Sequence, residues 1–145
     1  KIIINDCIAV AFFQQSLLHP HQFSIIVATN LNGDYISDAL AAQVGGIGIS
    51  PGANMNPKTG MAIFEATHGT APDIMGQDKA NPSALLLSAA MMFKYLGWHE
   101  VGSLIESVIQ QAINNRHIPA DFHMNDATVL GTRAFCHYLV TLINK

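Results

Sequence analysis

The stretch MAIFEATHGTAPDIMGQDKANPSALLLSAAMMFKYL, residues 61–96, decides the fold class. Residues 61–66 favour a strand, and residues 67–82 are a long polar loop rich in glycine and proline. Residues 83–96 are an apolar run that predicts a buried helix. Strands alternating with helices are typical of an α/β fold, and a structureless loop of this length is usually functional.

The rest of the chain predicts the same alternation. Helices are expected over residues 6–18 (capped by Asn5 or Asp6), 34–44 (stopped by Gly45 and Gly46), 101–114 and 133–143, and short strands over residues 24–28 and 47–49. Three strands are too few for a complete doubly wound sheet. Because the chain also begins at Lys1 without a methionine, we expect residues 1–145 to be a segment of a longer protein.

Composition excludes several classes of function. Half of the residues are apolar and 12% are charged, which indicates a large surface hidden in a subunit interface or against sequence outside this segment. The net charge is −3 and the cationic residues do not cluster, so the pattern argues against nucleic-acid binding. The most apolar stretch, residues 84–93, is too short to cross a membrane. Cys7 and Cys136 form no CxxC motif, and no secretory segment is visible, so we expect a cytoplasmic protein.

Asp34 and Asp38 lie four residues apart at the start of an expected helix, and therefore on one face of it. Two neighbouring carboxylates repel each other unless a cation lies between them, and ligands that offer only oxygen suit Mg²⁺ or Mn²⁺. The alternative is a pair of acidic residues placed at a helix N-terminus by the helix dipole.

The glycine-rich loops do not match a Rossmann fingerprint. Residues 46–52 would need glycine at position 51, where Pro51 stands. The loop after residue 66 is more informative, because Gly69 and Ala71 allow a ligand to approach the backbone closely. His68 by itself is more often a structural turn residue than a ligand.

Four motifs in this order resemble the β-decarboxylating dehydrogenases, and their spacing resembles the bacterial homodimeric isocitrate dehydrogenases. They are Asn30–Asp38, Gly45–Gly48, Glu65–Pro72 and Ala80–Pro82. The resemblance implies the C-terminal part of the isocitrate/isopropylmalate dehydrogenase fold, with non-Rossmann dinucleotide binding and a few strands of a larger sheet. It implies oxidative decarboxylation of isocitrate to 2-oxoglutarate, with Mg²⁺ or Mn²⁺ at Asp34 and Asp38. The implied cofactor-binding residues are Glu65, His68, Gly69, Thr70, Ala71, Pro72, Asp73, Ile74 and Asn81.

The same resemblance predicts NAD as the cofactor. NADP-using relatives grip the 2′-phosphate with a Lys-Tyr pair where this chain has Asp73 and Ile74, and with a Tyr and an Arg where Ala120 and Met124 align. A carboxylate repels a phosphate but accepts hydrogen bonds from ribose hydroxyls. The alternative is that Asp73 only caps a turn.

The chain also departs from the family. Val10 stands where the family has a third metal carboxylate, and relatives carry the aspartate that matches Asp6 as well. The cationic clamp for isocitrate and the catalytic tyrosine and lysine are absent, so we expect this segment alone to be inactive and a homodimer mate to complete the site. A homoisocitrate or 3-isopropylmalate dehydrogenase, or a catalytically impaired regulatory subunit, remain the alternatives.

Overall fold

The computed structural model describes residues 2–144 and separates into two compact units, one ending at Val44 and one beginning at Gly45. The mixed α/β class is confirmed. In the described residues the strands form two separate two-stranded sheets rather than one larger sheet. No helix in this part of the chain combines the length and the apolar character needed to cross a bilayer.

The first unit contains α1 (Ala9–Leu18), a 3-10 turn (Pro20–Gln22) and α2 (Asn30–Val44). Phe12 packs edge-on against Phe23, with ring centroids 4.9 Å apart, and Ile36 and Ala41 are buried on α2. The expected cap at Asn5 or Asp6 is wrong, because α1 begins at Ala9 after Ile8 and has no side-chain cap.

The expected strand over residues 24–28 is also wrong. No described residue pairs with this segment, and Ile25 and Val27 are 87% and 92% exposed. A run of β-branched residues favours extended backbone, but a strand exists only when a neighbour supplies the hydrogen bonds.

The second unit opens with Gly45 and Gly46, whose positive φ angles of 133° and 106° confirm the predicted helix stop. Residues 47–49, expected as a strand, form a 3-10 turn instead (Ile47–Ile49). A hairpin follows, in which β1 (Pro51–Met55) pairs antiparallel with β2 (Ala62–Ala66). The strand β1 was not predicted, because proline, glycine and asparagine have low strand preference.

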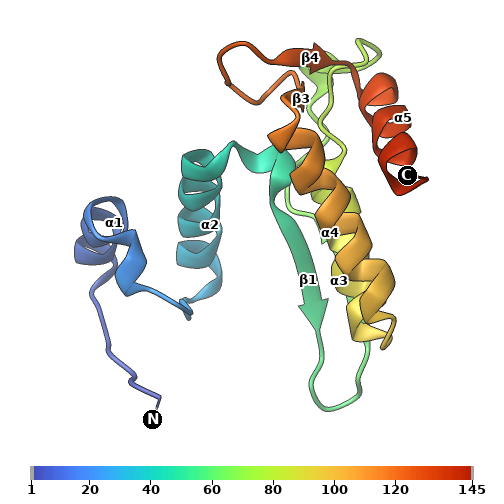
Figure 1. Cartoon of the computed structure of the whole chain (residues 1–145). Helices are drawn as coiled ribbons and strands as arrows, with labels where there is room; N and C mark the ends of the chain where they lie inside the picture. The colour runs from blue at the N-terminus through green and yellow to red at the C-terminus, as the bar shows by residue number, and fades with distance from the viewer. Residues whose placement is uncertain (1, 145) are drawn as a thin grey trace. The chain divides into compact units, whose positions relative to one another are not determined.

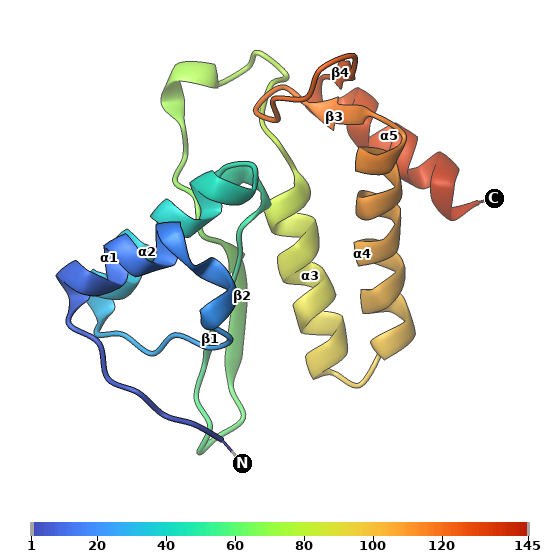
Figure 2. The same cartoon turned by 60° about the vertical axis from the view of Figure 1, so that its left-hand side comes forward.

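Helix α3 (Ser83–Tyr95) packs against this hairpin, and α4 (His99–Asn114) lies beside α3 on the side away from the hairpin (Figures 1 and 2). The parallel strands β3 (His117–Pro119) and β4 (Thr128–Leu130) precede the last helix, α5 (Thr132–Ile143). The three helices begin and end within two residues of their predicted limits.

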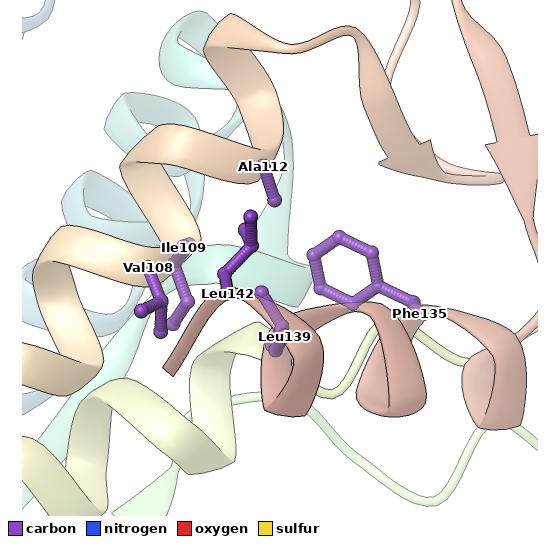
Figure 3. Close-up of a cluster of buried hydrophobic side chains, with 6 residues drawn as sticks. All are labelled: Val108, Ile109, Ala112, Phe135, Leu139 and Leu142. Atoms are coloured by element: carbon purple, nitrogen blue, oxygen red, sulfur yellow. The ribbon is translucent and has the colours of Figure 1, made fainter. Parts of the chain in front are cut away.

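The main core of the second unit lies between α4 and α5. Figure 3 shows how Phe135 and Leu139 from α5 meet Val108, Ile109 and Ala112 from α4. Phe135 and Ala112 are completely buried. This core fixes α5, and with it the residues at the start of that helix, against the rest of the unit.

Candidate functional site

The polar loop of residues 67–82 joins β2 to α3 and is anchored at both ends. The hydroxyl of Thr67 donates to the carbonyl oxygen of Ser50 at 3.0 Å, and Asn81 accepts the backbone N–H of Ser83 at 2.9 Å. A 3-10 turn, η3 (Pro72–Ile74), interrupts the loop. Ala71 precedes this turn with a left-handed backbone, φ 44°, a conformation that is uncommon for residues other than glycine.

One side of this loop faces a cavity of about 670 Å³, a volume in the range of small-molecule sites. Six of the nine predicted cofactor-binding residues line it: His68, Gly69, Thr70, Ala71, Ile74 and Asn81. The structure therefore brings most of the predicted loop together around one hollow.

Three predicted residues do not line the cavity. Pro72 and Asp73 lie in η3 and are exposed. Glu65 lies on β2, where its carboxylate accepts a hydrogen bond from the Asn54 amide at 3.0 Å. Their assignment to the cofactor stays a prediction.

The side chain of Asn81 is occupied by the fold itself. Its oxygen accepts from the Ser83 backbone N–H at the start of α3, and its nitrogen donates to the Asp121 carboxylate at 3.2 Å. Asn81 is 7% exposed, so the ligand-facing role predicted for it competes with a structural one.

The rest of the cavity lining lies outside loop 67–82, and the Gly45–Gly48 segment is the one part of it that the sequence analysis singled out as a motif. This remaining lining includes Gly48, Asp121, Thr132 and Arg133. A Cβ at Gly48 would come within 2.8 Å of the Asn81 side chain, so glycine is required here because the two segments pack closely. The G-x-G spacing was a signal for Gly48, whereas nothing local marks Asp121 or Arg133.

Asp78 ties the loop to the start of α5. Its carboxylate accepts the backbone N–H of Arg133 at 3.1 Å, and its carbonyl oxygen accepts that of Thr132 at 2.9 Å. The Thr132 hydroxyl donates to the carbonyl oxygen of Ala80 at 2.6 Å. These bonds satisfy amides at a helix N-terminus that lack partners within the helix.

Burial raises the pKa of the Cys136 thiol, and the nearby Asp78 carboxylate raises it further. Both effects disfavour the thiolate, so this cysteine is a poor nucleophile at neutral pH.

The predicted metal ligands lie in the first unit. Asp34 and Asp38 are one turn apart on α2, and both are exposed. Within the described residues, no group of three potential ligands for a metal ion is present. Val10, at the position of the missing carboxylate, is 81% exposed on α1. Two carboxylates on one helix face fit a hard divalent ion but do not fill its coordination.

Comparison with known proteins is consistent with these features. Residues 1–139 match the family model described as isocitrate/isopropylmalate dehydrogenase. The chain is 56% identical over 144 residues to the isocitrate dehydrogenase [NADP] of Streptococcus mutans, covering 99% of this chain and 37% of that protein. It is 57% identical over 122 residues to the isocitrate dehydrogenase [NADP] of Helicobacter pylori, covering 84% and 28%.

Solved structures agree. The isocitrate dehydrogenase of Methylococcus capsulatus superposes with a TM-score of 0.89 at 35% identity, over 97% of this chain and 40% of that one. The β-decarboxylating dehydrogenase of Thermococcus kodakarensis gives a TM-score of 0.82 at 32% identity, over 99% and 41%. The chain thus spans less than half of the length of each of these relatives.

Proposed function

Because the chain belongs to the isocitrate/isopropylmalate dehydrogenase family, we propose that it is the C-terminal segment of an NAD-dependent isocitrate dehydrogenase. The proposed reaction oxidises isocitrate and releases CO₂ to give 2-oxoglutarate. The observation that carries the proposal is the cavity of about 670 Å³ whose lining includes six of the predicted dinucleotide-binding residues.

The choice of NAD rests on four positions. Asp73 and Ile74 lie in the η3 turn of loop 67–82. Ala120 and Met124 lie in the link between β3 and β4 and are exposed. None of these side chains can bind a 2′-phosphate through a positive charge or a phenol hydroxyl. The relatives described above carry NADP in their names, which argues for the other cofactor, so the preference for NAD needs a direct test.

For the metal, we propose Asp34 and Asp38 as two of the oxygen ligands. When bound, Mg²⁺ or Mn²⁺ supplies positive charge to the hydroxyl and carboxylate of the substrate. The two side chains hold that ion on an exposed helix face, and further ligands come from the substrate and from a homodimer mate.

Isocitrate carries three carboxylates and needs a cationic clamp. The described residues provide two arginines, and Arg116 is already paired with Asp126 at 3.7 Å. We therefore place the clamp and the proton-transferring residues outside this segment, which is inactive alone in this proposal.

The test is an assay of the full-length protein with isocitrate, homoisocitrate and 3-isopropylmalate, each with NAD and with NADP and saturating Mn²⁺. Turnover of isocitrate with a preference for NAD is expected. Preference for another acid would favour a sibling enzyme, and preference for NADP would refute the cofactor assignment. No turnover with any pair would favour a regulatory subunit. Val10 is the reason for considering this alternative, because it stands where the family has a third metal carboxylate.

A further inference from the structure

The cavity contains a cationic side chain that the family-based prediction did not include. Arg133 lies in the first turn of α5, is exposed, and lines the same cavity as His68 and Gly69. Within residues 2–144 the ion pairs are Lys94–Glu106 and Arg116–Asp126, so the guanidinium of Arg133 has no carboxylate partner.

The position of Arg133 is fixed by the fold. Its backbone N–H donates to Asp78, and the preceding Thr132 hydroxyl donates to Ala80, so the first turn of α5 is held against the loop. The buried ring of Phe135 anchors the same turn in the core. A guanidinium on an anchored backbone loses less conformational freedom when it binds a ligand than one on a mobile segment.

The charged residues that line the cavity indicate which ligand groups the Arg133 guanidinium could bind. Lys79 also lines it. The Asp78 carboxylate accepts a hydrogen bond from the backbone N–H of Arg133, and the Asp121 carboxylate accepts one from the side-chain amide of Asn81. Both carboxylates are thus engaged with protein donors, whereas no protein hydrogen bond involves the Arg133 guanidinium in the described residues. A guanidinium on a residue that lines the cavity and has no protein partner can bind a phosphate with two parallel hydrogen bonds.

We propose that Arg133 binds a phosphate group of the dinucleotide. This inference rests on the proposed function for the identity of the ligand, and it assigns a contact to a position outside the loop motif. The phosphate is either the bridging diphosphate, present in NAD and NADP, or the 2′-phosphate, present only in NADP.

The experiment measures dissociation constants of the full-length protein for NAD and NADP by calorimetry, without substrate. Arg133→Met keeps the length of the side chain and removes its charge, and a roughly 10- to 100-fold weaker binding is expected from the loss of a charge-assisted contact. Equal losses for both nucleotides identify the diphosphate, and a loss confined to NADP identifies the 2′-phosphate. Arg133→Lys should recover part of the affinity.

The matched control is Arg116→Met, which removes the chain's other arginine outside the cavity. Unchanged affinity in Arg133→Met for both nucleotides, in a variant with the circular dichroism spectrum of the wild type, would overturn the inference. Because binding is measured without turnover, a protein that binds dinucleotide but does not oxidise isocitrate would refute the proposed function and leave the Arg133 contact measurable.

Discussion

The dinucleotide cavity and the Asp34–Asp38 carboxylate pair differ in how complete each site is within its own compact unit. The dinucleotide cavity has both walls in the second unit, where loop 67–82 and the start of α5 are joined by hydrogen bonds. The carboxylates Asp34 and Asp38 stand on an exposed face of α2 with no third acidic ligand among the described residues. A nucleotide pocket can therefore be formed by local packing, whereas a metal site needs ligands that converge from several directions.

The strongest way to break the cavity is to remove its support. Phe135→Ala should lower the free energy of unfolding by about 3–5 kcal/mol, because removal of this buried aromatic ring leaves a void in the core. Denaturant unfolding of the full-length protein measures the change. Val140→Ala on the exposed side of the same helix is the control, and a similar loss in both variants would contradict the assigned core.

The metal pair gives the next largest effect. Replacing Asp34 and Asp38 together by Asn should reduce turnover at least about 100-fold, since even outer-shell partners of a metal are worth 10- to 100-fold. Titration with Mn²⁺ should show the same loss of affinity. Gln43→Ala on the same helix is the control, and full activity in the double variant would remove the metal assignment.

The cofactor preference can be reversed by a smaller change. Asp73→Lys with Ile74→Tyr should shift the ratio of kcat/KM toward NADP by about 10-fold or more, because a cation replaces a carboxylate beside the loop. The ratio measured with both cofactors decides it. An unchanged ratio would show that position 73 does not face the ribose.

The smallest effect concerns pH. The pKa of Cys136 is raised in the folded state by burial and by Asp78, so its contribution to stability is present below the ordinary thiol pKa and is lost as pH rises through the raised value. Cys136→Ala should flatten the alkaline decline of thermal stability. A decline that is identical in the variant would assign it to other groups.

The helices of the second unit could be predicted from a long apolar run in residues 83–96 and from amphipathic spacing in residues 101–114. The loop residues His68 to Ile74 could be predicted from a contiguous motif. Asp121 and Arg133 could not, because they reach the cavity only through the packing of α5 and of the link before it. The strand β1 could not be predicted because Pro51 and Gly52 have low strand preference. Glycine is needed at position 52 because a Cβ there would come within 2.9 Å of the Glu65 carbonyl oxygen.

Asp78 has a left-handed backbone, φ 56°, and holds the first turn of the last helix through both its carboxylate and its carbonyl oxygen. The pocket therefore cannot widen between Asp78 and α5 without breaking the hydrogen bonds that hold the first turn of this helix. Because Asp78 itself lines the cavity, its substitution is expected to loosen this wall and to change how fast a bound nucleotide leaves.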